Sequence, residues 1–552
     1  MVRPEQIDPV LADVSRRVRV ALVAAGLPDT EPPFERPRLP EHGDWSTPVA
    51  LGLAREASQP PRMIAERLVA ELEVPELVEK VEVAGPGFVN FRFSHRYFED
   101  MVRRVLREGE AYGHRTRLAD EVEQVNVEFV SANPTGPLHV GAGRWAAAGD
   151  SIAALLEADG HCVHREYYLN DTGEQIRRFG KSILRAARGQ PLTAEHYRGT
   201  HVAEIAEEVR AAHGEGFFAG SEDEVVERVS EAATSRMIAQ IRELLHRLGV
   251  DFDVWFSERA LHSEGEVKAT VEALVEAGLA FRQEGAIYLR TSEFGDDKDR
   301  VLVRSDGRPT YFAADCSYLR NKRDRGYDRM IYLLGADHHG YVRRLEAVGA
   351  ALGIPEGSLE IRIGQMVNLL RQGEPVRMSK RAGDFITLDE VVDEVGVDVT
   401  RYHFLRQSLD TTIDFDLAEV VRASMDNPVY YVQYAHARIA SILRNADDSG
   451  FEPGPHDDAA LDLLTEPTEE ELLRRLAELP EVVAEAAEMR APHRLARYAE
   501  DLAGSFHRFY TECRVLGVRE DIGRARYWLA VAAKRVLANA LLLLRVSAPE
   551  RM

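Results

Sequence analysis

A histidine stands where a strand pattern gives way to a helix pattern, a position suited to binding phosphate. The segment Pro134-Thr-Gly-Pro-Leu-His-Val-Gly141 has a loop composition and leads from His139 into an apolar stretch of helical spacing. Free backbone N–H groups and the helix dipole stabilise an anion at such a helix start. Gly141 has no side chain and lets a nucleotide approach the backbone closely. The alternative is that His139 only caps the helix.

A basic segment further along the chain could bind the rest of a triphosphate. In Arg377-Met-Ser-Lys-Arg381, followed by Ala382-Gly383, three cations lie close together. Lys380 could act as a mobile point charge on a leaving pyrophosphate, with Arg377 beside it. A solvated basic turn is the alternative. The sequence has neither a P-loop nor a G-x-G-x-x-G motif, so a nucleotide would not be held as in P-loop or dinucleotide-binding enzymes.

The elements around these residues predict a parallel sheet. A strand at 125–129, a helix from about 140 to 159 and a second strand at 162–169 form a βαβ unit. The apolar strand 330–334 runs into Gly335-Ala-Asp-His-His-Gly340 and another helix, which repeats the strand-loop-helix order. We therefore expect both loops to open at the carboxyl edge of one doubly wound sheet.

The flanking regions predict further domains. Helical spacing and two strands around a Gly85-Pro-Gly87 turn indicate an α/β module at the N-terminus, and only helical patterns follow residue 426. We divide the chain into an N-terminal α/β module (1–112), a Rossmann-like catalytic domain (113–370) with a helical insertion at about 174–280, a connecting segment with the basic loop (371–424), and an all-α domain (425–552).

Composition and charge argue against several classes of protein. The 552-residue chain carries a formal charge of −23, which argues against nonspecific binding to DNA or RNA but leaves room for a local basic groove. Cys162, Cys316 and Cys513 lie far apart without C-x-x-C spacing, which excludes a disulfide framework and a cysteine zinc site. Apolar runs fall short of the roughly 18 residues of a membrane span. We expect a cytoplasmic protein that does not bind membranes.

Four histidines could instead form a metal site. They are His161, His164, His338 and His339. His161 and His164 are three apart on a predicted strand, which sends them to opposite faces and spoils joint ligation. We expect no tightly bound metal, because a Mg²⁺ bound through ATP phosphates needs few protein ligands.

The two phosphate-binding candidates resemble the signatures of class I aminoacyl-tRNA synthetases. His139-Val-Gly-Ala142 resembles the H-I-G-H motif, and Arg377-Met-Ser-Lys380 resembles the K-M-S-K motif. Longer strings resemble arginyl-tRNA synthetases of the bacterial type over nearly the whole chain: Gly85–Phe91, Val127–His139, Tyr168–Gly173, Asp306–Asp315 and Asp426–Arg438.

This resemblance implies an activity. Such an enzyme activates L-arginine with ATP and Mg²⁺ to arginyl-adenylate and transfers the arginyl group to the 3′ end of tRNA(Arg). It is expected to be a monomer, to require tRNA for activation, and to recognise the anticodon with its all-α domain. The alternatives are a silent RNA-binding paralogue and a nucleotidyltransferase of the same superfamily that does not use tRNA.

The resemblance also implies roles for particular residues. A guanidinium needs carboxylates in fork geometry, and Glu128 and Asp315 fit that need. The implied arginine pocket comprises Glu128, Ser131, Asn133, Tyr311 and Asp315; the ATP site comprises His139, Gly141, Ala142, Asp337, His338, Met378 and Lys380; catalysis is assigned to His139, Arg377, Ser379 and Lys380. Structural alternatives are a core aromatic on a strand 310–313 for Tyr311 and a helix N-cap for Asp315.

One position departs from the family pattern. Ala142 replaces the second histidine of H-I-G-H, and Trp145 stands where a small residue is common. The other motif residues are retained, so we predict full activity. The helix N–H groups, with Thr135 or Arg144, would then make the phosphate contact.

A helix face in the all-α domain carries aromatic and basic residues. Tyr431, Tyr434 and Arg438 have the spacing of one face and could stack on unpaired tRNA bases. The alternative is that this face packs into its own helical bundle.

Overall fold

The centre of the molecule is a five-stranded parallel sheet. A computed structural model describes residues 7–37, 39–376 and 386–552. The strand order is β11-β10-β4-β5-β6, with β4 Gln124–Glu128, β5 Cys162–Leu169, β6 Val254–Ser257, β10 Arg329–Gly335 and β11 Leu359–Gly364. Every neighbouring pair is parallel, which confirms the predicted sheet.

The strand order fixes where a ligand can bind. The first half of the domain adds β5 and β6 on one side of β4, and the second half adds β10 and β11 on its other side. The order therefore reverses between β4 and β10. In open α/β sheets ligands bind at the carboxyl edge beside such a switch point. The loops before α5 (Val140–Ala158) and α12 (Val342–Ala351) open there, as predicted.

The helical segment predicted at about 174–280 is interrupted by one strand of the main sheet. Helices α6 (Glu174–Ala187), α7 (Thr200–His213) and α8 (Glu222–Arg247) are present. After them the chain returns to the main sheet as β6, which pairs with β5. All of the short strand β6 is partly exposed, so it lacks the alternation of buried and exposed residues that identifies a longer strand.

A small antiparallel sheet precedes the next part of the site. It contains β7 (Ala280–Gln283), β8 (Ala286–Leu289) and β9 (Arg300–Val303), and helices α9 (Glu258–Ser263) and α10 (Glu266–Glu276) lead into it. Helix α11 then spans Tyr311–Asp324, with Thr310 as the N-cap whose side chain accepts from the N–H of Ala313. Both structural alternatives are therefore wrong: Tyr311 lies on no strand, and Asp315 caps no helix.

The connecting segment has a small sheet of its own, with the strand order β13-β12-β14. It contains β12 (Val367–Arg371), β13 (Glu374–Pro375), α13 (Leu388–Val395), α14 (Val397–Leu405), β14 (Ile413–Asp416) and α15 (Leu417–Val420). The predicted residues Arg377, Met378, Ser379 and Lys380 lie outside the described residues.

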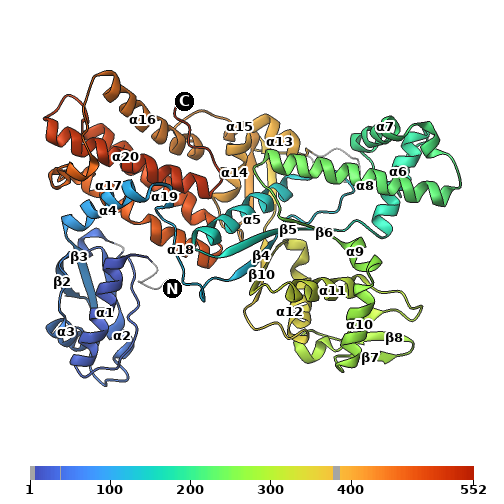
Figure 1. Cartoon of the computed structure of the whole chain (residues 1–552), viewed down its shortest axis with the longest axis horizontal. Coiled ribbons are helices and arrows are strands. Elements are labelled where there is room, and N and C mark those ends of the chain that lie inside the picture. The colour runs from blue at the N-terminus through green and yellow to red at the C-terminus, as the bar shows by residue number, and fades with distance from the viewer. Residues whose placement is uncertain (1–6, 38, 377–385) are drawn as a thin grey trace.

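The two terminal domains pack against each other. The N-terminal module combines α1 (Pro9–Ala24), α2 (Val49–Leu53), α3 (Pro61–Glu71) and the sheet β1-β3-β2 (Trp45–Thr47, Phe88–Phe93, Val78–Ala84), and α4 (His95–Glu108) leaves it. The C-terminal bundle contains α16 (Pro428–Asp448), α17 (Pro467–Ala477), α18 (Leu479–Met489), α19 (Pro492–Glu512) and α20 (Glu520–Leu543). Arg36 and Glu481 form an ion pair of 2.7 Å between them. Figure 1 shows both at one end of the molecule and the α6–α8 insertion at the other. Among the described residues, no helix has the length and apolar character that a membrane crossing requires.

Candidate functional site

The start of α5 gives His139 a fixed orientation. His139 is the N-cap residue, and its Nδ1 accepts from the N–H of Ala142 at 3.2 Å. A Cβ added at Gly141 would lie 3.0 Å from the imidazole ring, so glycine lets the ring fold over the helix start. The capping alternative is therefore present in the structure. It is compatible with phosphate binding, because the cap holds the imidazole at the positive end of the helix.

The chain that follows the basic segment returns beside this histidine. Thr387 pairs with His139 in an isolated β-bridge, and the N–H of Leu388 donates to the carbonyl of Leu138 at 2.9 Å. Thr387 also caps α13 together with Glu390. The described chain after the K-M-S-K-like segment is thus anchored, from Thr387 onward, at the start of α5.

Arg144 and Trp145, which follow Ala142 in α5, have structural roles. Arg144 is fully buried and donates to the carbonyls of Gln365 and Ser408, each at 2.8 Å. The prediction that Arg144 contacts phosphate is therefore wrong, because backbone acceptors occupy its guanidinium. Trp145 fits because residue 364 is glycine, where a Cβ would lie 1.9 Å from the indole ring. Thr135 and Ala142 are also buried.

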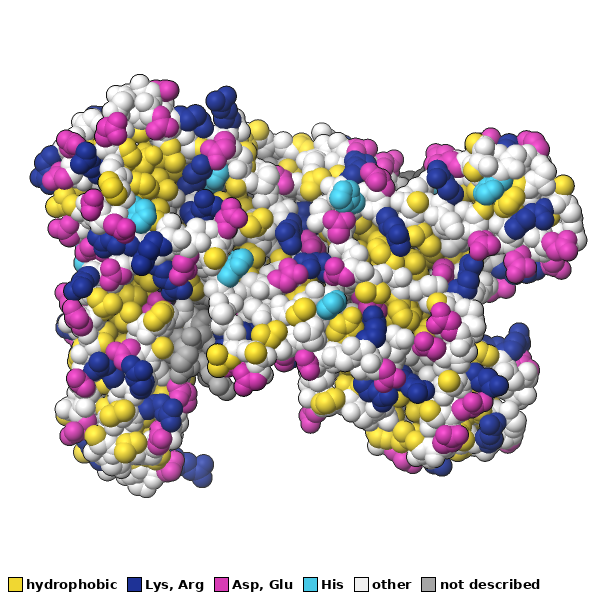
Figure 2. Space-filling model, in the orientation of Figure 1, with side chains coloured by type: hydrophobic (Ala, Val, Ile, Leu, Met, Phe, Trp, Pro, Cys, Tyr) yellow, Lys and Arg dark blue, Asp and Glu magenta, His cyan; other side chains and the backbone are white. Residues whose placement is uncertain are grey.

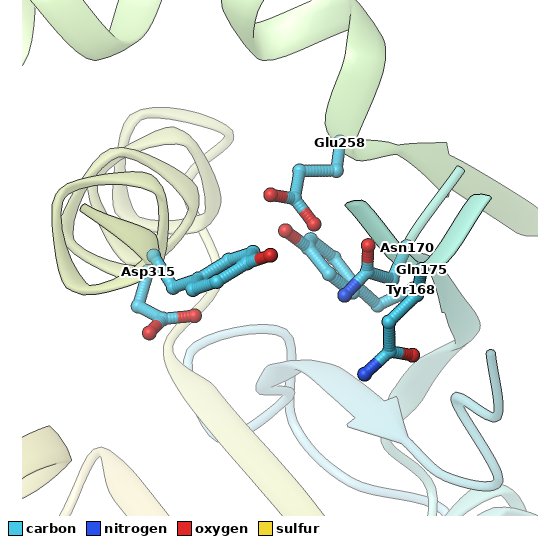
Figure 3. Close-up of a pocket in the computed structure, with 6 residues that line it drawn as sticks. Tyr168, Asn170, Gln175, Glu258 and Asp315 are labelled. Atoms are coloured by element: carbon cyan, nitrogen blue, oxygen red, sulfur yellow. The ribbon is translucent and has the colours of Figure 1, made fainter. Parts of the chain in front are cut away.

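A cavity of about 260 Å³ lies beside the carboxyl ends of β5 and β6. Figure 3 shows Asp315 on the α11 side and Glu258 on the opposite side. The cavity is lined by Tyr168, Asn170, Gln175, Glu258, Tyr311 and Asp315. Its two carboxylates make it suited to a cationic ligand.

The two cavity carboxylates are held with raised pKa values. Burial, together with the nearby charges of Glu258 and Glu128, raises the pKa of Asp315 to about 7, although a hydrogen bond from the Tyr341 hydroxyl lowers it. Burial also raises the pKa of Glu258, while the Tyr168 hydroxyl and His262 lower it. His262 Nε2 lies 3.7 Å from the Glu258 carboxylate. The positive charge of a guanidinium between the two carboxylates would favour both ionised forms.

The contacts of Glu128 differ from those predicted. Its carboxylate accepts from Lys322 Nζ at 2.6 Å, from the Tyr318 hydroxyl at 2.7 Å and from Ser131 Oγ at 3.1 Å. Lys322 is fully buried, so Glu128 compensates its charge. Glu128 and Ser131 do not line the cavity, and the described geometry does not support a direct contact of Glu128 with a guanidinium.

Two other residues predicted for the arginine pocket, Tyr311 and Asn133, lie in or next to the cavity. Tyr311 lines the cavity and is 59% exposed, so its ring is available to a ligand. Asn133 also lies outside the lining but donates to Gln175 Oε1 at 2.8 Å. Glu258 was missed because β6 was missed. An acidic residue directly after a parallel strand is the signal that would have identified it.

The second strand-end loop is open to solvent. Asp337 and His338 lie in a 3₁₀ turn after β10, with side chains 82% and 53% exposed. The rival metal site is not assembled. His161 and His164 lie at the beginning of β5, while His338 and His339 follow the end of β10, so the two pairs are at opposite edges of the parallel sheet.

The predicted tRNA-binding face is partly packed. The Tyr431 ring contacts His507 of α19, with centroids 4.9 Å apart, as the packing alternative predicts. Arg438 lies over the rings of both Tyr434 and Tyr510, at 4.6 and 4.7 Å. Tyr434 and Arg438 are only partly buried, so an aromatic and basic patch remains accessible.

Comparisons with known families match this architecture along the chain. A model described as "tRNA synthetases class I (R), catalytic domain" matches residues 101–404. A model described as "Arginyl tRNA synthetase N terminal domain" matches residues 10–93, and one described as "DALR anticodon binding domain" matches residues 432–552.

Similar proteins lead to the same family. A curated arginine–tRNA ligase from Frankia alni is 48% identical, and the match covers 100% of both chains. The structure of an arginyl-tRNA synthetase from Thermus thermophilus matches with a TM-score of 0.78 and 25% identity, covering 98% of this chain and 100% of that one. An arginyl-tRNA synthetase from Plasmodium falciparum shares the fold, with a TM-score of 0.76 at 16% identity over 100% of both chains. The chain belongs to the arginyl-tRNA synthetase family of class I aminoacyl-tRNA synthetases.

Proposed function

We propose that this enzyme attaches L-arginine to tRNA(Arg) and selects arginine with Asp315 and Glu258. The observation that carries the proposal is the presence of two opposed carboxylates in a cavity of about 260 Å³. Both have raised pKa values, chiefly because they are buried. A fork of N–H donors on a planar cation complements this arrangement. Tyr311 and Tyr168 offer aromatic rings beside the guanidinium.

The reaction proceeds without a covalent bond to the enzyme. The arginine carboxylate attacks the α-phosphorus of ATP, and the bond to pyrophosphate breaks. A ribose hydroxyl of the terminal adenosine of tRNA then attacks the arginyl carbonyl and releases AMP. Catalysis consists mainly of positioning and charge stabilisation.

ATP is assigned to the edge between β4 and β10. His139 and the start of α5 would face the α-phosphate, with Gly141 allowing a close approach and Ala142 beside them. Asp337 and His338 would lie along the nucleotide. Mg²⁺ would enter with ATP and neutralise charge on the phosphates, and the exposed carboxylate of Asp337 is of the ligand type it prefers. Arg377, Met378, Ser379 and Lys380 are proposed for the leaving pyrophosphate; the tether between Thr387 and His139 supports their proximity.

Transfer RNA is proposed to lie along the C-terminal bundle and across the catalytic edge. Tyr434 and Arg438 would stack on unpaired bases, with Tyr431 supporting them from the packed side. Figure 2 shows dark blue lysine and arginine side chains interspersed with acidic ones, so this face offers basic side chains despite the net charge of −23. We also propose a cytoplasmic monomer, activation that depends on bound tRNA, and the four-segment division with boundaries near residues 112, 370 and 424.

The test is kinetic. Removing one partner of a buried charge pair costs about 2 to 5 kcal/mol, so Asp315→Ala and Glu258→Gln should each raise the arginine KM by tens of fold or more. The KM for ATP should change little. Glu264→Gln is a matched control, since Glu264 is the exposed C-cap of the same helix. An unchanged arginine KM in both pocket variants, with intact folding, would refute the assignment.

A further inference from the structure

Arg401 of α14 is fully buried and bonds to three other elements. Its Nε donates to the carbonyl of Leu544 at 3.2 Å, its Nη1 to the carbonyl of Leu248 at 3.0 Å, and its Nη2 to Asp150 Oδ2 at 2.8 Å. Each nitrogen of the guanidinium therefore has an acceptor from a different part of the chain. A lysine, with a single nitrogen, could not span these three directions.

Two of the acceptors are helix ends. Leu248 is the C-cap of α8, and Leu544 is the C-cap of α20. Carbonyl groups at a helix C-terminus lack intrahelical partners and carry the negative end of the helix dipole. The buried cation of Arg401 thus satisfies two helix ends and one carboxylate at once.

These elements lead to different parts of the enzyme. Helix α5, which carries Asp150, begins at the H-I-G-H-like motif, and α8 leads through β6 to Glu258 of the cavity. Helix α14 follows the K-M-S-K-like segment. Helix α20 lies in the region that matches the DALR anticodon binding domain. One side chain therefore connects the anticodon-binding bundle to the helix behind the ATP site.

Asp150 extends the connection into the central sheet. Its other oxygen, Oδ1, accepts from Arg165 Nε of β5 at 3.1 Å. The backbone N–H of Arg165 donates to Asp253, directly before β6, at 2.8 Å. Arg545, directly after α20, lies 3.9 Å from Asp150 and has a left-handed φ of 54°, which fixes the chain direction at this helix end.

We propose that Arg401 is a positioning residue that couples anticodon binding to the rate of arginylation. A shift of the α20 end on tRNA binding is transmitted through Arg401 to Asp150 and so to α5. The proposal rests on the proposed function, in which the bundle binds the anticodon. It adds a route by which the wrong anticodon lowers kcat and does not merely weaken binding.

The experiment measures this coupling directly. Steady-state arginylation is measured with transcripts of tRNA(Arg) that carry the native anticodon or single substitutions in it, for the wild type, Arg401→Lys and Arg165→Lys. The Arg165→Lys variant is a matched control, because the Arg165 side chain donates to the same carboxylate and to Glu157, both on α5, and no hydrogen bond from it to α8 or α20 is found among the described residues. Thermal unfolding sets an assay temperature at which all three remain folded, and Asp150→Asn replaces Arg401→Lys if the latter does not fold.

The expected readout is a ratio of rates. In the wild type, an anticodon substitution should lower kcat at least tenfold. In Arg401→Lys this penalty should fall below about threefold, while Arg165→Lys retains it and the arginine KM stays within about twofold of wild type in both. The proposal is overturned if Arg401→Lys keeps the full anticodon penalty in kcat, or if both variants lose the penalty equally. It is also overturned if the wild-type kcat does not depend on the anticodon. A failed arginine pocket would instead appear in the Asp315 and Glu258 variants through the arginine KM.

Discussion

The affinity for arginine should depend on pH through Asp315. Burial and the neighbouring carboxylates raise the pKa of Asp315 to about 7. The arginine guanidinium is charged throughout this range and favours the ionised carboxylate. Binding should therefore release a proton, and affinity should rise as the pH rises through 7.

The size of the effect follows from this pKa. With a pKa of about 7, Asp315 is ionised in about nine tenths of the molecules at pH 8 and about one tenth at pH 6. The dissociation constant of arginine should thus increase about tenfold from pH 8 to pH 6. The raised pKa of Glu258 acts in the same direction.

Calorimetry on the full chain checks this prediction. Arginine is titrated between pH 6 and 8 in two buffers with different ionisation enthalpies, which reports both affinity and the protons released. Asp315→Asn is the control: it should bind weakly and lose most of the dependence. An affinity that stays flat between pH 6 and 8, or rises on acidification, would refute the reasoning.

Three further predictions concern the surroundings of the site. Ala142→His should change kcat by less than about tenfold, or roughly 1.4 kcal/mol, because His139 already caps the N–H of residue 142; a wild type without arginylation above background that Ala142→His restores would favour the silent-paralogue alternative. Glu128→Gln should lower the free energy of unfolding by about 3 to 5 kcal/mol, because it leaves Lys322 buried without its counter-charge; an unchanged midpoint in urea would contradict this. Gly364→Ala should destabilise the fold because its Cβ meets the Trp145 ring, and adding Trp145→Ala should restore part of the loss; additive losses in thermal unfolding would argue against that contact.

Much of the fold was predictable because long elements leave periodic signals. The strand at 125–129, helix α5 and the strand β5 follow one another with clear changes of period, and glycine and proline mark the loop between them. The short edge strand β6 gives no such signal. Because β6 was not predicted from the sequence, Glu258 was not recognised as a residue at the carboxyl end of a strand of the main sheet.

Other parts of the site depend on distant contacts. The strand pattern correctly placed Glu128 on β4, at whose carboxyl end it lies, but its partner Lys322 comes from α11, far along the chain. Tyr311 and Asp315 lie on the first turns of that helix, where β-branched and aromatic residues gave a local strand signal. Arg144 looked like a phosphate ligand by position alone. The carbonyls of Gln365 and Ser408 that occupy it become neighbours only in the folded chain.

The central claim is that Asp315 and Glu258 recognise the positive charge of arginine. Citrulline has the same shape with a neutral urea group, so its activation isolates that charge. ATP–pyrophosphate exchange in the presence of tRNA(Arg) should give the wild type a preference for arginine over citrulline in kcat/KM of at least about 10³. Asp315→Asn and Glu258→Gln should each reduce that preference by tenfold or more. A preference that both variants retain in full would contradict the account.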